Sequence, residues 1–261
     1  MRAVSLRPFR RRARLAVALA LFGMLLAHGA TSAPLPNLSG TWAAVEVYSG
    51  YLNTPLFGKL PGAITAGFRV EIAQSGSALT MSARYCTLGV GSPLPFVTAE
   101  IPPALLAALR GVEQSATLEP SSAGALFTQP WRSQLSGAHV SDADPLPATS
   151  DDPRVFDEDK DGHPGVTLHA SLAEFLSTDL YLVIRLRYRL SGSVVSPDRI
   201  DGLIEWTGEI VVLGGSLPIL PSRHVAHPDP DPQKSWFVLV RVDPSCDCAS
   251  LATTPTDLTN R

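Results

Sequence analysis

Alternating apolar and polar side chains predict β-strands at several places in this chain. Residues 41–48, 68–73 and 79–85 each alternate, and a Ser-Gly-Ser turn at 75–77 joins the second and third segments. Because a strand points successive side chains to opposite faces, each segment has one face suited to a core. Residues 68–85 therefore predict a β-hairpin with one buried face.

The strongest alternation predicts a second hairpin, from residue 180 to residue 212. Six apolar residues in 180–190 share one face and three arginines share the other, while acidic residues follow beyond a turn near 196–198. The charged residues are Arg185, Arg187, Arg189, Glu205 and Glu209. The arginine row suits either an anion site or a solvated face with cross-strand ion pairs, each worth roughly 0.2–1 kcal/mol. The matching glutamates favour the ion pairs, and a last strand is expected at 235–242.

The middle of the chain, residues 88–164, lacks strong periodicity and is rich in glycine, proline, serine and aspartate. It predicts a loop-rich insertion with one short helix at 103–110, which proline opens and glycine follows. The 23 prolines of the chain disfavour a helical bundle. We therefore expect an all-β fold, a mostly antiparallel barrel or strongly bent sheet, in a single domain at 33–248.

The first 32 residues have the layout of a secretory signal peptide. Six arginines precede an apolar run at 15–27, and small residues follow at 29–33. The run is shorter than the roughly 20 apolar residues that cross a bilayer, and no second long run follows. We expect a secreted or periplasmic protein that is not an integral membrane protein, with a flexible tail at 249–261.

Export changes the charge of the protein. Removing the six arginines of this segment from the 21 basic residues leaves 15 against 24 acidic residues, a net charge of −9. Nucleic-acid binding depends on neutralising phosphates, so a nucleic-acid partner is not expected.

Three aspartates and a glycine form the clearest chemical motif. Asp157, Asp159 and Asp161 alternate, and Gly162 follows them. Calcium prefers six to eight oxygen ligands, and alternate carboxylates can converge on one ion where glycine lets the chain turn sharply. The pattern resembles the D-x-D-x-D-G loop of EF-hands. By that resemblance the aspartates supply side-chain ligands, and His163 supplies its backbone carbonyl.

The loop departs from the EF-hand at two positions. Leu168 stands where the EF-hand has a bidentate glutamate, and Pro164 lacks an N–H. We therefore expect a single structural calcium site with an affinity of roughly 10⁻⁴–10⁻³ M. The alternative is an acidic, solvated loop that binds no ion.

Three cysteines offer several pairings in an oxidising compartment. Cys86 lies on a predicted strand, and Cys246 and Cys248 follow the last strand. A disulfide from Cys86 to either of them would fasten the C-terminal segment to an early strand. A strained Cys246–Cys248 ring and a zinc site with a distant histidine are the alternatives.

The sequence contains no clear catalytic signature. It has no G-x-S-x-G nucleophile elbow, and His224 and His227 precede a proline-rich stretch that favours a solvated loop. Four glutamates lie on predicted strands, but their spacing does not distinguish a glycosidase pair from surface charge. These residues are Glu46, Glu71, Glu205 and Glu209.

The start of the mature domain carries a G-x-W motif, Gly40-Thr41-Trp42, that resembles the opening of lipocalin-like barrels. In that family the tryptophan closes the barrel floor beneath an arginine, a role that Arg241 would take here. A disulfide from Cys86 to the C-terminal cysteines also looks like that family's strand-to-tail bridge. The long middle insertion and the lack of a C-terminal helix pattern depart from it. The wider layout, with its D-x-D-G-H-P-G loop, is similar to secreted proteins of unknown function from Gram-negative bacteria.

Together these features predict an exported, calcium-stabilised β-protein. We expect a non-enzymatic binding or cell-surface protein, with an apolar cavity for a small hydrophobic ligand or a surface for a partner. The alternative is an extracellular hydrolase that uses calcium as a structural ion.

Overall fold

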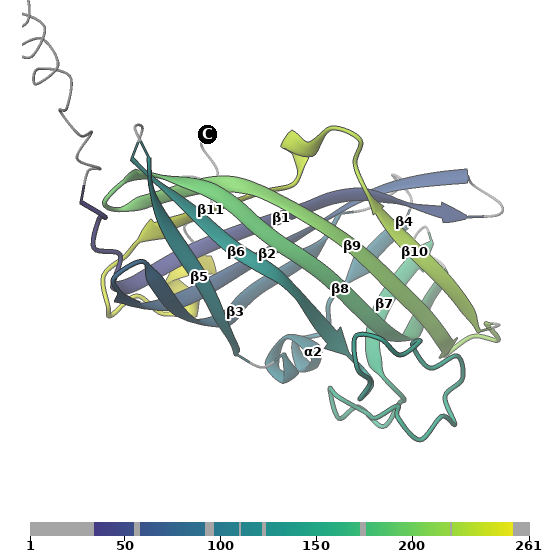
Figure 1. Ribbon diagram of the computed structural model, residues 1–261. Helices are drawn as coiled ribbons and strands as arrows, with labels where there is room; N and C mark the ends of the chain where they lie inside the picture. Colours follow the sequence, from purple (N-terminus) through teal and green to yellow (C-terminus); the bar gives the residue numbers. More distant parts are fainter. Residues whose placement is uncertain are drawn as a thin grey trace, which may run out of the picture. The chain divides into compact units, whose positions relative to one another are not determined.

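The computed structural model describes residues 34–54, 58–91, 97–109, 111–121, 124–172, 176–219 and 221–252. Nearly all regular structure in these residues is β, as expected (Figure 1). The strands are β1 Gly40–Thr54, β2 Gly58–Ser75, β3 Ala78–Val90, β4 Val97–Glu100, β5 Val112–Ser121, β6 Gly124–Ser136, β7 Val166–Leu172, β8 Leu176–Ser196, β9 Arg199–Gly215, β10 Ser222–Pro228 and β11 Trp236–Arg241. The helices are α2 Pro103–Ala108, α3 Cys248–Ala252 and a 3₁₀ turn, η1 Pro232–Lys234.

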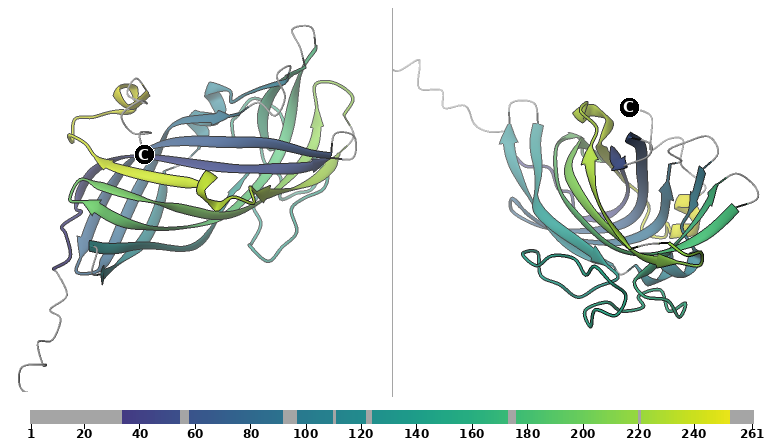
Figure 2. Two further views of the ribbon diagram at one scale, coloured as in Figure 1. Left: turned by 90° about the horizontal axis from the view of Figure 1, so that it is seen from above. Right: turned by 90° about the vertical axis from the view of Figure 1, so that its right-hand side faces the viewer.

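The strands form one antiparallel sheet that bends into an incomplete ring (Figure 2). Around the ring the strand order is β9-β11-β1-β2-β3-β5-β6-β8. The pairing of β8 with β9 joins the two ends of this order. β10 pairs with both β9 and β1, while β7 and β4 continue the sheet from β8. β5 and β6 pair only from Thr117↔Thr128 to Ser121↔Gly124, which leaves an opening between their other halves. The fold is therefore the expected strongly bent, barrel-like sheet.

Both predicted hairpins form, and the second pairs its arginine row with its glutamate row as expected. β2 and β3 join at a turn over residues 76–77. In β8 and β9, Arg185 lies opposite Glu209 and Arg189 opposite Glu205. A slip by one residue would carry these charges to the core face, so the alternation excludes that register.

Two apolar clusters fill much of the ring. The larger one includes the fully buried Trp42, Phe127, Tyr188, Phe237 and Leu239. In the other, Leu105 of α2 packs against Val166 of β7 and Leu182 of β8. Burial of these side chains supplies the main driving force for closing the sheet.

The structure corrects the loop-rich segment expected at 88–164. This segment contains β4, α2, β5 and β6, and within the described residues its long loop is confined to 137–165. The alternation in β5 and β6 is weak because several buried positions carry Gln114, Ala116 and Gln129 rather than large apolar residues. The expected short helix is present as α2.

The 137–165 loop packs on the outer face of β8 and β9. Ala138 and Leu146 join a buried cluster there with Tyr181, Val183 and Val211. Figure 2 shows this loop outside the ring, beside these strands. The arginine row predicted that this face of β8 is solvated, but the 137–165 loop covers part of it.

The 137–165 loop buries Arg185, which the sequence predicted to lie on a solvated face. Its cross-strand partner Glu209 is the expected one, at 3.3 Å, but Arg185 is only 5% exposed. Its guanidinium also donates to the backbone carbonyls of Ser141 and Asp144, at 3.1 and 2.7 Å. Arg185 therefore fastens the loop to the sheet, a role that the sequence did not predict.

The C-terminal segment expected to be a flexible tail begins as α3, whose Leu251 packs against the outer face of β1 and β11. A C-terminal helix is thus present where the sequence predicted none. Residues 253–261 and the predicted signal peptide at 1–32 lie outside the described residues. No described helix is both long and apolar enough to cross a bilayer.

Candidate metal centre and the adjoining cleft

The acidic motif forms a closed loop immediately before β7. The Glu158 N–H donates to the Gly165 carbonyl and the Gly165 N–H donates to the Phe156 carbonyl, both at 3.0 Å. Asp157 and Gly165 thereby form a parallel bridge. Gly162 has φ 90°, a left-handed conformation that glycine adopts without strain. These contacts turn the chain sharply enough to gather alternate side chains.

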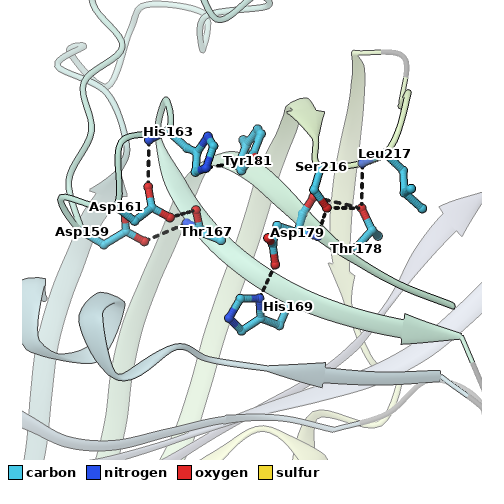
Figure 3. Close-up of polar contacts among 10 residues, drawn as sticks. All are labelled: Asp159, Asp161, His163, Thr167, His169, Thr178, Asp179, Tyr181, Ser216 and Leu217. Carbon is cyan, nitrogen blue, oxygen red and sulfur yellow. Dashed lines mark hydrogen bonds and ion pairs between the residues drawn. The ribbon is translucent and has the colours of Figure 1, made fainter. Parts of the chain in front are cut away.

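Hydrogen bonds orient the first and last aspartates of the motif. Asp157 accepts from the N–H groups of Asp161 and Gly162, at 3.2 and 2.9 Å. Asp161 accepts from the His163 N–H at 2.9 Å and from the Thr167 hydroxyl (Figure 3). One oxygen from each of the three aspartates lies within 4.8 Å of the others. The structure therefore brings the three predicted side-chain ligands together.

Asp159 is the carboxylate that most needs a further partner. It is 7% exposed, its Oδ2 accepts from the Thr167 N–H at 2.9 Å, and its Oδ1 is buried without a hydrogen-bond partner. A buried acceptor left unpaired costs about 1–3 kcal/mol, and a charged one costs more. Burial, together with the charges of Asp161 and Asp157, raises the pKa of Asp159. A cation among the three carboxylates would pair Oδ1 and offset their repulsion.

The available ligands suit a hard divalent cation. They are carboxylate and carbonyl oxygens, which calcium prefers. The His163 ring stacks on Tyr181, with 4.3 Å between ring centroids, and it is not among the side chains that converge with the aspartates, so its backbone carbonyl remains the predicted ligand. Leu168, at the position of the EF-hand glutamate, packs instead with the apolar cluster around α2. With that ligand missing, a weak site completed by water fits the residues present.

A cleft of about 720 Å³ adjoins the metal loop, a volume typical of small-molecule sites. Residues 132–136 of β6 line one side, and Gly111 and Val112 line the other at the start of β5. Phe156 and Glu158, neighbours of the triad in sequence, also line it. The cleft thus lies where β5 and β6 are not paired. Its walls carry both polar and apolar side chains, whereas the sequence predicted an apolar cavity.

Glu46 is a buried carboxyl inside the ring. It is 5% exposed and accepts a hydrogen bond from the Tyr48 hydroxyl. Burial raises the pKa of Glu46 to about 7, although the Tyr48 hydrogen bond and the charge of Arg132 act in the opposite direction. From the sequence, Glu46 was one of four glutamates on predicted strands, with nothing to distinguish it from surface charge. Glu46 shares a face of β1 with Trp42 and Tyr48, however, and this alternation indicates an inward position.

β6 adds polar side chains to the same interior. Gln134 accepts from the Tyr85 hydroxyl at 2.7 Å, and the Arg132 guanidinium lies 5.5 Å from the centre of the Tyr188 ring. Arg132 and Gln134 also line the cleft. The sequence did not single out these residues because the alternation in β6 is weak and a bulge interrupts it between Gln129 and Arg132.

The structure resolves the cysteine pairing that the sequence left open. Cys86 and Cys248 form a disulfide, with Cα atoms 4.8 Å apart, and Cys246 is a free thiol. The alternatives of a Cys246–Cys248 ring and a zinc site using both cysteines are therefore wrong. Arg69 holds the same segment by donating to the carbonyls of Pro244 and Cys246, at 3.1 and 2.8 Å.

Trp42 and Arg241 meet at one end of the ring, as the resemblance to lipocalin-like barrels implies. The Arg241 guanidinium carbon lies 4.6 Å from the centre of the Trp42 ring. Arg241 also donates to the carbonyls of Ser39 and Asn37, at 2.7 and 2.9 Å, while the Trp42 indole donates to the Leu38 carbonyl at 2.9 Å. These contacts fasten the segment before β1 across this end.

The histidines do not assemble a nucleophilic site among the described residues. His169 pairs with Asp179 near Ser216, but the Ser216 hydroxyl oxygen accepts from the Asp179 backbone N–H at 2.9 Å (Figure 3). A serine nucleophile needs a base within hydrogen-bond reach, and the described contacts place none on this hydroxyl. His224 and His227, expected in a solvated loop, lie on β10.

Comparison with protein-family models finds no match to this chain, and comparison with curated proteins also finds none.

Proposed function

We propose that this chain is an exported, calcium-stabilised binding protein with a lipocalin-like barrel, and that its calcium loop forms part of the ligand cleft. The observation that carries the proposal is the buried, unpaired Oδ1 of Asp159 within an all-oxygen triad beside the cleft. Calcium bound by Asp157, Asp159, Asp161 and the His163 carbonyl would be structural.

The metal loop and the cleft share residues, which supports a link between ion and ligand. Phe156 and Glu158 line the cleft, and Glu158 accepts from the Gly137 N–H at 2.6 Å. Because Glu158 stands between two predicted ligands in sequence, an ion that orders those ligands would also order this part of the wall. Binding only to the folded protein would add stability by mass action.

Other features support the location and the barrel assignment. The Cys86–Cys248 disulfide suits a secreted or periplasmic protein, because disulfides persist in oxidising compartments. The contact of Arg241 with Trp42 supports the lipocalin-like assignment. The cleft at the unpaired halves of β5 and β6 would give a ligand its entrance to the barrel.

Calcium binding is tested by thermal unfolding and isothermal titration calorimetry of the mature protein. With a Kd of roughly 10⁻⁴–10⁻³ M, 10 mM calcium should stabilise it by about 1.4–2.7 kcal/mol relative to EDTA. For a chain of this size that corresponds to a rise in Tm of roughly 3–10 °C. Asp159→Asn should abolish the rise, whereas Asp151→Asn, an exposed acid in the same loop, should keep it.

Calorimetry should give one calcium per chain in the wild type. Equal Tm values in EDTA and calcium, with no heat of binding, would show that the triad is a solvated acidic loop and would remove the proposal. An equal loss of the calcium response in both variants would place the ion elsewhere.

A further inference from the structure

Two neighbouring inward positions of β6 carry polar atoms that nothing in the described structure satisfies. Gln129 is 1% exposed, and neither its amide oxygen nor its amide nitrogen has a hydrogen-bond partner. Arg132 buries its Nε and Nη1 atoms, also without partners. These residues lie opposite Leu190 and Tyr188 of β8, both core residues, so their side chains face the interior. Unpaired buried donors of this kind need water or a ligand.

The cleft reaches Arg132 from the side of the ring. Arg132 and Gln134 line the cleft, at the opening between the unpaired halves of β5 and β6. Gln129 precedes Arg132 on the inward face of β6, beyond the bulge, and is more deeply buried. A group that enters through this opening reaches Arg132, and Gln129 occupies the preceding inward position of the same strand.

The groups around Arg132 leave its positive charge incompletely balanced. Glu46 is the acid whose charge interacts with it, but Glu46 also accepts from the Tyr48 hydroxyl, and burial raises the pKa of Glu46 to about 7. Tyr85 and Tyr188 also interact with this pair, and burial raises the pKa of each phenol, which keeps both neutral. A guanidinium stays charged at all relevant pH values and pairs best with an oxyanion.

We infer that the opening between β5 and β6 admits a small organic carboxylate, whose charged group binds Arg132 and hydrogen-bonds to the Gln129 amide. Its apolar body would lie against apolar side chains of the cleft such as Leu109, Val112 and Phe156. The inference deepens the proposed binding function by naming the chemical class of the ligand and its side entrance. It does not require calcium to touch the ligand.

A panel of matched probes tests this assignment by calorimetry and NMR. Acetate, hexanoate and benzoate are compared with hexanamide, benzamide and inorganic phosphate, each in EDTA and in 10 mM calcium. At least one carboxylate should bind, its amide should bind about tenfold more weakly or worse, and the Arg132 side-chain Nε–H resonance should shift on binding. Arg132→Gln should weaken carboxylate binding about tenfold or more, whereas Arg187→Gln, an exposed arginine of β8, should leave it unchanged.

Several results would overturn the inference. The inference is wrong if no carboxylate binds, if a carboxylate and its amide bind equally, or if phosphate binds in place of the carboxylates. It is also wrong if the two arginine variants lose carboxylate affinity equally. Carboxylate binding without a calcium effect on Tm would contradict the calcium role alone. A normal calcium response without carboxylate binding would contradict only the ligand assignment.

Discussion

Replacing Glu46 by glutamine should make the protein more stable at and above pH 7 and flatten its dependence on pH. The Glu46 carboxyl is 5% exposed and accepts a hydrogen bond from Tyr48. Burial raises its pKa to about 7 in the folded protein, from 4.5 as the reference value. Between these two values the folded state holds a proton that the unfolded state has released, so stability falls as pH rises through this window.

The size of the effect follows from the two pKa values. Their difference corresponds to about 3 kcal/mol lost from the free energy of unfolding by pH 8. Glutamine has nearly the same shape and keeps an oxygen for the Tyr48 hydroxyl, but it carries no charge at any pH. Glu46→Gln should therefore match the wild type at pH 4 and exceed it by up to about 3 kcal/mol at pH 8.

Urea unfolding at pH 4, 5, 6, 7 and 8, followed by tryptophan fluorescence, measures this difference. Glu113→Gln, at an exposed position of β5, is the matched control and should stay parallel to the wild type. A constant difference between Glu46→Gln and the wild type across this range would refute the reasoning, because it would mean that the Glu46 carboxyl titrates alike in both states.

Three further substitutions test other parts of the fold. Cys248→Ser removes the disulfide to Cys86, which spans 162 residues, and should lower the free energy of unfolding in urea by on the order of 5 kcal/mol. Cys246→Ser should cost little, and equal losses in the two variants would argue against this pairing. Arg241→Gln removes the contact with Trp42, three hydrogen bonds to backbone carbonyls and the ion pair with Asp198, so we expect a loss of at least about 2 kcal/mol and a changed tryptophan emission. Unchanged values would show that these contacts do not hold this end of the ring together. Leu146→Ala should cost about 2–5 kcal/mol and expose the amides of the 137–165 loop to hydrogen exchange; an unaffected loop would mean that it does not depend on packing against the sheet.

The sequence by itself determined the local elements of this protein. Alternation and the Ser-Gly-Ser turn specify the β2–β3 hairpin, and the arginine and glutamate rows specify the register of β8 with β9. The acidic motif also needs only local information, because the glycine turn and the backbone N–H groups that orient Asp157 and Asp161 lie within a few residues of each other. Short-range sterics and hydrogen bonding act on neighbours, so patterns of neighbours reveal them.

The tertiary structure decided everything that depends on distant segments. It paired Cys86 with Cys248, covered Arg185 with the 137–165 loop, and turned Glu46 and Arg132 toward one interior. It also left β5 and β6 unpaired at one end, which created the cleft. These features arise when the sheet closes on itself, and the burial and charge environment of each side chain then depend on strands far away in the sequence. Alternation along one strand shows which residues share a face, but not what that face will meet.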